Sequence, residues 1–122
     1  AIEAEARRRG RGIWETGAIG PWSATDAALA ARAGRYALVE GRVVSHGRSR
    51  RVAYLNFGED WSRDFTVLVR KTDLETWPEA ARDLERFVGR RVRARGTLEA
   101  WNGALIRAEH PAQIEILAGR AD

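Results

Sequence analysis

Cysteine and methionine are both missing from this chain of 122 residues. Without Cys there is no disulfide framework and no thiolate zinc site, and a Cys-free chain is compatible with reducing and with oxidising compartments. Without Met the chain does not begin at an encoded start, so either a signal peptide was removed or the chain is a piece of a longer protein, and we expect the second. No apolar run approaches the roughly 18 residues of a membrane-spanning helix, and no membrane partner is expected.

Lysine is also scarce, because Lys71 is the single Lys among 21 basic residues, which face 17 acidic ones. Arg therefore carries almost all of the positive charge, and the formal net charge is +4. The guanidinium group matches phosphate oxygens with two parallel hydrogen bonds, so an Arg-rich balance favours phosphate recognition. Codon bias in a GC-rich genome produces the same composition without such a function. Only the placement of the arginines separates the two explanations.

The length suits one domain with an appended segment. We expect residues 1–34 to form an N-terminal extension and residues 35–122 to form the main domain. Within the extension, Ala1–Arg11 contains good helix formers with Glu early and Arg late. Trp14 to Trp22 is interrupted by Gly and Pro but is too apolar for a free linker. We expect it to lie on the main domain or on a neighbouring one.

Two further helices are predicted. The Ala-rich stretch Asp26–Ala33 can be capped by Ser23 or Thr25. In Leu74–Phe87 apolar residues recur at spacings of three and four, and Pro78 falls in the first turn, where it is tolerated. The pattern predicts one continuous helix over Leu74–Phe87.

From Tyr36 onward apolar residues alternate with polar ones, which is typical of β-strands with one buried face. The expected strands are Tyr36–Val44, Val52–Phe57, Phe65–Val69, a strand through residues 92–98, Ala104–Glu109 and a short closing strand, Gln113–Leu117. The expected inward-facing residues are Ala37, Val39, Gly41, Val43, Ala53, Leu55, Phe57, Phe65, Val67, Val69, Val92, Ala94, Gly96 and Leu98. Asn102-Gly103 predicts a two-residue type I′ turn.

This order, β-β-β-α-β-β, predicts a mainly β fold, a five-stranded OB-type barrel with a helical and irregular N-terminal extension. A β-sandwich would need about seven strands and no central helix. In OB folds the loop between strands one and two and the loop between strands four and five flank the binding face. Ser45–Arg51 is the first of these loops, and its arginines Arg48, Arg50 and Arg51 can follow a phosphate backbone. The alternative is a solvated surface loop.

Two outward-facing sets extend this candidate surface. Tyr54, Asn56, Thr66 and Arg70 should point out of the barrel, as a stacking aromatic with polar neighbours would. Val52 and Leu68 share that face, so burial under the Trp14 to Trp22 segment is the alternative. Arg91, Arg93 and Arg95 form a stripe that can bind phosphates or pair with Glu40, Glu99 or Glu109. The predicted nucleic-acid-binding residues are Arg48, Arg50, Arg51, Tyr54, Asn56, Arg70, Arg91, Arg93, Arg95 and Trp101.

Little in the chain suggests catalysis or metal binding. Glu59, Asp60 and Asp64 lack the spacing of an EF-hand and suit caps in the turn, in which Trp61 would cover the barrel end. His46 and His110 are the only imidazoles, and there is no Cys to act with them. We predict no catalytic residue, no metal site and no cofactor.

Four stretches resemble a known family: YALVEGRV (Tyr36–Val43), YLNFGEDWSRDFT (Tyr54–Thr66), RRVRARGTLE (Arg90–Glu99) and HPAQIE (His110–Glu115). They are similar to the C-terminal domain that follows the nuclease domain in bacterial thermonuclease-like (staphylococcal-nuclease-like) proteins. The resemblance spans roughly residues 35–117, and AEARRRGRGIW looks like the last helix of the nuclease domain itself.

The resemblance implies a non-catalytic OB-type accessory domain, because the family's metal-binding and catalytic residues would precede Ala1. Whether the longer protein cleaves phosphodiester bonds depends on residues outside this chain. Together with the arginines, this favours a domain that binds nucleic acid, single-stranded, weakly and without strong sequence preference. The alternative is a structural or protein-interaction domain that docks on the preceding nuclease-like domain.

Overall fold

The computed structural model describes residues 19–58, 64–101 and 103–117, and for Trp101 it describes the backbone only. In this part of the chain eight strands form one mixed sheet and the helices are short, so the fold is mainly β, as predicted. No helix among these residues is long and apolar enough to span a membrane. The predictions for Ala1–Arg11, Trp14 and Glu59 to Trp61 concern residues outside the described ranges.

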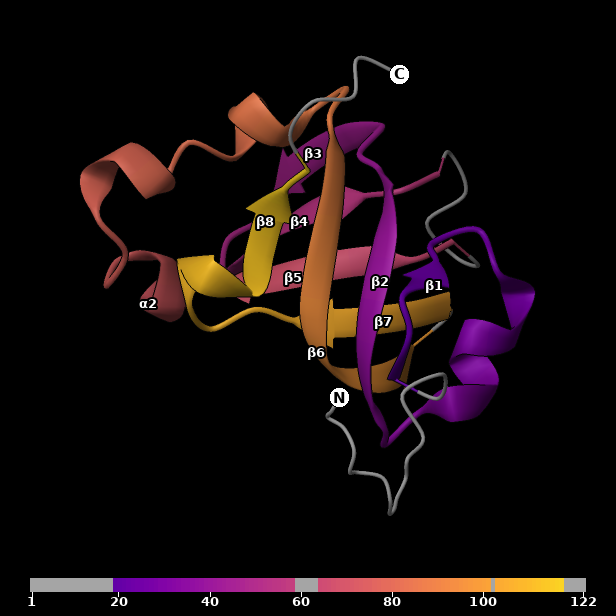
Figure 1. The fold of residues 1–122 in the computed structure, drawn as a ribbon. Helices are drawn as coiled ribbons and strands as arrows, with labels where there is room; N and C mark the ends of the chain where they lie inside the picture. Colours follow the sequence, from indigo (N-terminus) through magenta and orange to yellow (C-terminus); the bar gives the residue numbers. More distant parts are fainter. Residues whose placement is uncertain (1–18, 59–63, 102, 118–122) are drawn as a thin grey trace, which may run out of the picture.

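Figure 1 shows the order of the elements along the chain. They are β1 (Trp22–Ser23), the 3₁₀ helix η1 (Ala27–Arg32), β2 (Tyr36–Arg42), β3 (Ser45–Arg48), β4 (Val52–Asn56), β5 (Thr66–Arg70), α2 (Lys71–Leu74), η2 (Glu79–Ala81), η3 (Leu84–Phe87), β6 (Arg91–Trp101), β7 (Gly103–Arg107), η4 (Pro111–Gln113) and β8 (Ile114–Ile116). Neighbouring strands follow the order β1-β2-β6-β7-β5-β4-β3, and β8 also pairs with β6.

The sheet wraps round because β2 and β3, which lie far apart in this order, are joined by only Val43 and Val44. The backbone N–H of Val43 donates to the carbonyl of Arg90 on the β6 side, at 3.0 Å. The N–H of Val44 donates to Asn56 on β4, at 2.8 Å. Consecutive residues thus bond to opposite ends of the sheet. Among the described strands, this bent segment joins β2 to β3, and no ladder of hydrogen bonds pairs these two strands.

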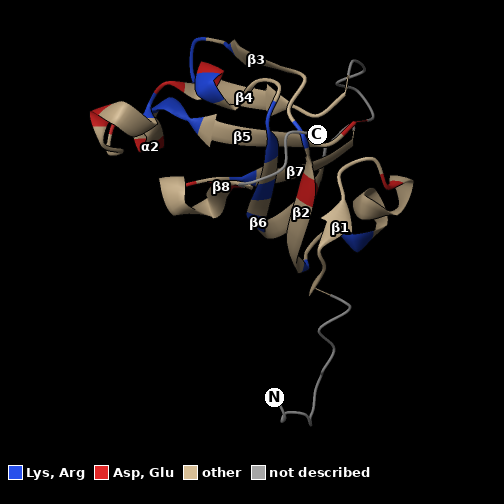
Figure 2. Cartoon of the chain, turned by 45° about the horizontal axis from the view of Figure 1, so that its top comes forward, with Lys and Arg blue, Asp and Glu red and all other residues tan. Residues whose placement is uncertain are grey.

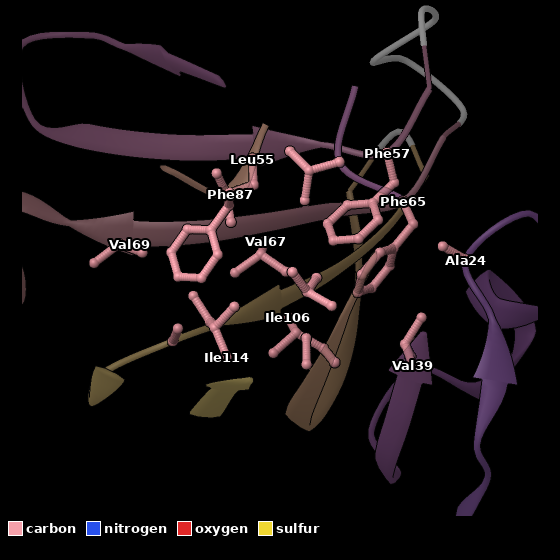
Figure 3. Packing of buried hydrophobic residues seen from close by; sticks show 14 of the residues in the cluster. Ala24, Val39, Leu55, Phe57, Phe65, Val67, Val69, Phe87, Ile106 and Ile114 are labelled. Atoms are coloured by element: carbon pink, nitrogen blue, oxygen red, sulfur yellow. The ribbon is translucent and has the colours of Figure 1, made fainter. Parts of the chain in front are cut away.

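The core lies inside this wrapped sheet and includes all of the predicted inward-facing residues except the two glycines, together with residues such as Phe87, Ile106 and Ile114 (Figure 3). Thirteen of the fourteen predicted residues are buried, and Gly41 is half-buried. Phe57 and Phe65 meet edge to face, with ring centroids 5.0 Å apart. Leu29 of η1 and Ala24 belong to the same cluster, so the segment before β2 packs on the barrel.

The prediction of one helix over Leu74–Phe87 is wrong, because the structure has three short helices, α2, η2 and η3, in this region. Pro78 lacks an N–H and has an extended conformation (ψ 146°), which separates α2 from η2. Asp83 then begins η3 by accepting a hydrogen bond from the N–H of Glu85 at 3.1 Å. The apolar spacing correctly identified buried residues, including Trp77, but three short turns satisfy it as well as one helix does.

Arginine side chains satisfy carbonyl groups that a continuous helix would have paired. The Nε of Arg82 donates to the carbonyl of Trp77 at 2.9 Å, and its Nη2 donates to that of Glu75 at 3.0 Å. The Nη1 of Arg86 donates to the carbonyl of Ala81 at 2.8 Å. These bonds offset the cost of leaving helix-end carbonyls without partners.

The helix predicted for Asp26–Ala33 forms, but its predicted cap is wrong. The helix is a 3₁₀ helix over Ala27–Arg32, and Asp26 caps it by accepting from the N–H of Ala28 at 2.9 Å. Ser23 instead accepts from the N–H of Thr25 and bonds to its hydroxyl. Ser23 and Thr25, the predicted caps, therefore hydrogen-bond to each other just before the helix and do not cap it.

The hairpin of β6 and β7 forms as expected, but its register excludes a two-residue turn at Asn102-Gly103. Ala100 is opposite Ala104 and Leu98 is opposite Ile106, so the pairing is centred on Asn102, which lies outside the described residues. A two-residue turn would shift the ladder by one, so that Ile106 would no longer share a side of the sheet with Leu98. The buried pairs therefore decide the register over the local turn signal.

Candidate nucleic-acid interface

The candidate surface is the outer face of β3, β4 and β5, which we call the β4 face. Residues directly opposite each other share a side of the sheet, so Gly47, Tyr54 and Leu68 form one row across it. Ser45, Asn56 and Thr66 form the next row. All six side chains or backbones are half-buried. The predicted outward positions of Tyr54, Asn56 and Thr66 are therefore those of the structure.

Gly47 makes room for the ring of Tyr54. A Cβ atom at residue 47 would lie 2.6 Å from Cε1 of Tyr54, closer than two carbon atoms can approach. The ring thus lies against the backbone of β3, with its position limited by the neighbouring strand. Sequence reasoning missed Gly47, because the pairing that brings it opposite Tyr54 is known only once Ser45–Arg48 is seen to be a strand.

Hydrogen bonds order the second row. The Nδ2 of Asn56 donates to Oγ of Ser45 at 3.1 Å. The Oδ1 of Asn56 is buried and has no hydrogen-bond partner within the described part of the chain. The amide is therefore oriented by Ser45, at the cost of one unpaired acceptor.

The predicted loop Ser45–Arg51 is shorter than expected, because its first four residues are strand β3. The turn itself is closed by a bond from the N–H of Ser49 to the carbonyl of Val52, at 2.8 Å. Arg48 ends β3, and Arg50 and Arg51 lie in the turn; all three are exposed. A strand pattern was not visible in the sequence here, since His46 and Gly47 interrupt the alternation of apolar residues.

The end of β5 adds more positive charge beside this turn. The N–H of Lys71 donates to the carbonyl of Arg51 at 2.9 Å, and Arg70 is opposite Val52. We call Arg48, Arg50, Arg51, Arg70 and Lys71 the basic end of the β4 face (Figure 2). Sequence analysis did not identify Lys71 as a candidate binding residue, although the pairing of β4 with β5 brings it next to Arg51.

The five cations of the basic end differ in their partners. Arg70 pairs with Asp73 at 2.9 Å and approaches Glu109 at 3.9 Å. Arg48 donates to the carbonyl of Arg82 at 3.4 Å. Within the described ranges no ion pair forms at Arg50 or Arg51. Arg50 and Arg51 are therefore the guanidinium groups of the basic end that a phosphate can bind without displacing an ion pair or a hydrogen bond.

The stripe Arg91, Arg93 and Arg95 is ion-paired, which is the alternative weighed for it above. Arg93 lies 2.6 Å from Oε2 of Glu40, and Arg95 lies 2.9 Å from Oε1 of Glu115. Arg91 is 3.6 Å from Glu40. Blue segments of β6 accordingly lie beside a red segment of β2 (Figure 2). Partly exposed pairs of this kind contribute roughly 1 kcal/mol or less, so phosphate could replace them at modest cost.

The acids expected near this stripe divide between different partners. Glu40 pairs as predicted, whereas Glu99 pairs with Arg107 at 3.2 Å. Glu109 lies near Arg70 instead, and Glu115 of β8 supplies the second carboxylate of the stripe. Sequence reasoning missed Glu115 because β8 is a short strand whose neighbour cannot be read from its pattern.

Trp22, the described end of the apolar segment expected over the β4 face, lies elsewhere. It belongs to β1, opposite Val39 of β2, and the guanidinium of Arg32 lies 4.5 Å from its ring centroid. Val52 and Leu68 are half-buried on the β4 face. The backbone of Trp101 ends β6, while its side chain is outside the described part.

The two loops that flank the binding face in OB folds lie at opposite ends of β4 and β5. Val52 and Arg70 are opposite each other beside the turn that contains Arg50 and Arg51, which we call the basic turn. Thr66 is opposite Leu105 near the β6–β7 hairpin. The β4 face therefore extends between them. In the described part of the chain no group of three or more His, Asp or Glu residues is placed to hold a metal ion.

Comparison with known proteins supports the fold and leaves the family open. No family model and no curated protein matches the chain. Among solved structures, asparaginyl-tRNA synthetase from Pyrococcus horikoshii matches 84% of this chain and 24% of its own, at 15% identity and a TM-score of 0.54. A lysozyme-bound OBody, AM1L10, matches 83% of this chain and 88% of its own, at 21% identity and a TM-score of 0.49. The topology, together with the likeness to the synthetase structure, is that of a mainly β, OB-type fold.

Proposed function

We propose that this domain binds single-stranded nucleic acid, weakly and without strong sequence preference, on the β4 face and its basic end. The observation that carries the proposal is the pair Arg50 and Arg51, which are exposed and form no ion pair among the described residues. They end a face on which Tyr54 offers an aromatic ring. Charge on the backbone and stacking on the bases together give binding that depends little on sequence.

The arrangement of charge around this face supports the proposal. From Gly41 to Gly58 the chain has four arginines and no acidic residue, although 17 acids occur in the whole chain. A phosphate at the basic turn therefore meets no carboxylate from β3 or β4. Codon bias alone accounts for the number of arginines but not for the absence of acids at this place. The likeness to the synthetase concerns the fold and adds nothing to this argument.

The test is a fluorescence-anisotropy titration of a labelled oligodeoxythymidylate at several salt concentrations. If Arg48, Arg50 and Arg51 each contact a phosphate, the logarithm of affinity should fall with the logarithm of salt at a slope near −2, since each contact on a single strand contributes about −0.7. Changing all three to Ala should flatten the slope by about that amount. The free energy of unfolding of this triple variant should stay nearly unchanged, because exposed surface residues contribute little to stability.

Two control variants keep the interpretation specific. Changing the same three residues to Lys preserves the charge and should preserve most of the slope. Arg35→Ala removes one exposed charge before β2, away from the turn, and should change the slope little. Absent binding at low salt, or binding that does not depend on salt, would refute the proposal.

A structural or protein-interaction domain is the second candidate, and two exposed apolar residues favour it. Tyr36 at the start of β2 is 52% exposed and Ile19 is 42% exposed. A preceding nuclease-like domain is the proposed partner. In that case Tyr36→Ser should raise the protease sensitivity of the longer protein while leaving that of the present chain unchanged, and no oligonucleotide should bind. Equal protease sensitivity of the longer protein and its variant would refute the docking role.

A further inference from the structure

A second group of arginines lies where β2 ends and β6 begins. Arg42 and Arg91 are direct partners in the ladder of these strands, and Arg90 precedes Arg91. Like charges directly opposite each other destabilise a pair of strands. We call Arg42, Arg90 and Arg91 the β2–β6 cluster. An anion bound beside these guanidinium groups would reduce the repulsion between them.

The carboxylate nearest to the cluster is already engaged. Glu40 lies 2.6 Å from Arg93 but 3.6 Å from Arg91, so its stronger contact is outside the cluster. Arg42 donates to the carbonyl of Gly89 at 2.6 Å. Arg90 is exposed and has no ion-pair partner in the described part of the protein. Arg90 is therefore the guanidinium group of the cluster that a phosphate can bind without displacing a carboxylate.

The backbone places this cluster at the far end of β3 from the basic turn. The carbonyl of Arg90 accepts from Val43, and the next residue, Val44, donates to Asn56 of the β4 face. β3 has four residues, so about 13 Å of strand separates the cluster from Arg48. Val44 lies between them and is 42% exposed, which offers an apolar contact to a sugar or base.

We propose that the β2–β6 cluster is a second phosphate-binding site, so that a bound single strand runs along β3, from the basic turn to Arg90 and Arg91. This inference rests on the proposed function and adds the direction of the strand. Two groups of arginines, joined by a stretch without acids and by Val44, fit one continuous polyanion better than two separate anions. A 12-nucleotide strand is long enough to contact both groups, given site sizes of about 4–16 nucleotides per OB fold.

The experiment uses the whole chain and compares two variants, Arg90→Ala and Arg35→Ala. Each variant lacks one exposed arginine. With a labelled 12-nucleotide oligodeoxythymidylate, Arg90→Ala should flatten the salt slope by about 0.7 and Arg35→Ala should not. With a dinucleotide probe, whose single phosphodiester cannot contact both groups and which we expect at the basic turn, neither change should alter the slope. Equal melting temperatures of both variants and the unchanged protein exclude a folding effect.

The outcomes separate this inference from the proposed function. If the 12-nucleotide probe binds through the basic turn but Arg90→Ala behaves like Arg35→Ala, the second site is refuted and the proposed function stands. If the unchanged protein binds neither probe at low salt, both are refuted. If Arg90→Ala alone flattens the slope for the longer probe, the strand runs along β3.

Discussion

Gly96 on β6 is the position where the wrapped sheet should tolerate a side chain least. Its φ of +157° lies in a region that side chains disfavour, and an added Cβ would lie 2.8 Å from Cγ2 of Ile106. Ile106 is fully buried on the paired strand β7, so it has little freedom to move. Backbone strain of this kind costs about 1–3 kcal/mol, and overpacking costs about 1–3 kcal/mol. Gly96→Ala should therefore lower the free energy of unfolding by roughly 3 kcal/mol.

Two further glycines separate the contributions. Gly34 has a φ of +93° and nothing within 4 Å of an added Cβ, so Gly34→Ala measures backbone strain alone. Gly41 has no positive φ, but its Cβ would lie 2.6 Å from Cβ of Ala24, so Gly41→Ala measures overpacking alone. We expect each single effect to be smaller than that of Gly96→Ala.

Denaturant unfolding and thermal melting followed by circular dichroism measure these differences. For a domain of this size about 1 kcal/mol shifts the melting temperature by roughly 4 °C or more, so Gly96→Ala should lower it by more than about 10 °C. A melting temperature within a few degrees of the unchanged protein would refute the close approach of β6 and β7. If Gly34→Ala and Gly96→Ala lower the free energy of unfolding equally, backbone strain accounts for the whole effect at Gly96.

Three further predictions concern the core, the ion pairs and catalysis. Phe65→Ala should lower the free energy of unfolding by about 3–5 kcal/mol, whereas Tyr36→Ala should change it by about 0.5 kcal/mol or less; calorimetry would contradict this if the two losses were equal. Glu40→Gln should cost about 1 kcal/mol or less and steepen the salt slope of oligonucleotide binding by about 0.7 or more, because it frees a guanidinium; an unchanged slope would exclude the stripe from the interface. The purified domain should leave DNA and RNA uncut with calcium or magnesium, and cleavage abolished by Asp60→Ala would show that the turn carboxylates are catalytic.

The strands could be predicted because a period of two directly reports which face of a sheet is buried. Ala53, Leu55, Val67 and Val69 are all fully buried, as the alternation indicates. The helix prediction failed because a spacing of three to four residues fits several short turns around one core as well as a single helix. Pro78 was read as a tolerated first-turn residue, and the structure shows it instead as the break between two turns.

The candidate site could be predicted only in part, because pairing across strands determines which charges are neutralised. The sequence places Arg93 and Arg95 on one side of a strand, but it does not indicate that Glu115 of a short terminal strand lies beside them. The absence of acids from Gly41 to Gly58 was visible in the sequence and identifies the less neutralised region. Counting acids along the chain, rather than arginines alone, would have found it.

The bend at Val43 and Val44 connects the architecture with the proposed function. Before the bend, β2 carries Glu40 against β6, where Glu40 pairs with Arg91 and Arg93. After the bend, β3 crosses to the other edge of the sheet, where its neighbour β4 contains no acid. The same change of partner that lets the sheet wrap round thus separates the ion-paired arginines from Arg50 and Arg51. Arginines occur on both sides of the bend, and the acids of the neighbouring strand decide which of them are already paired.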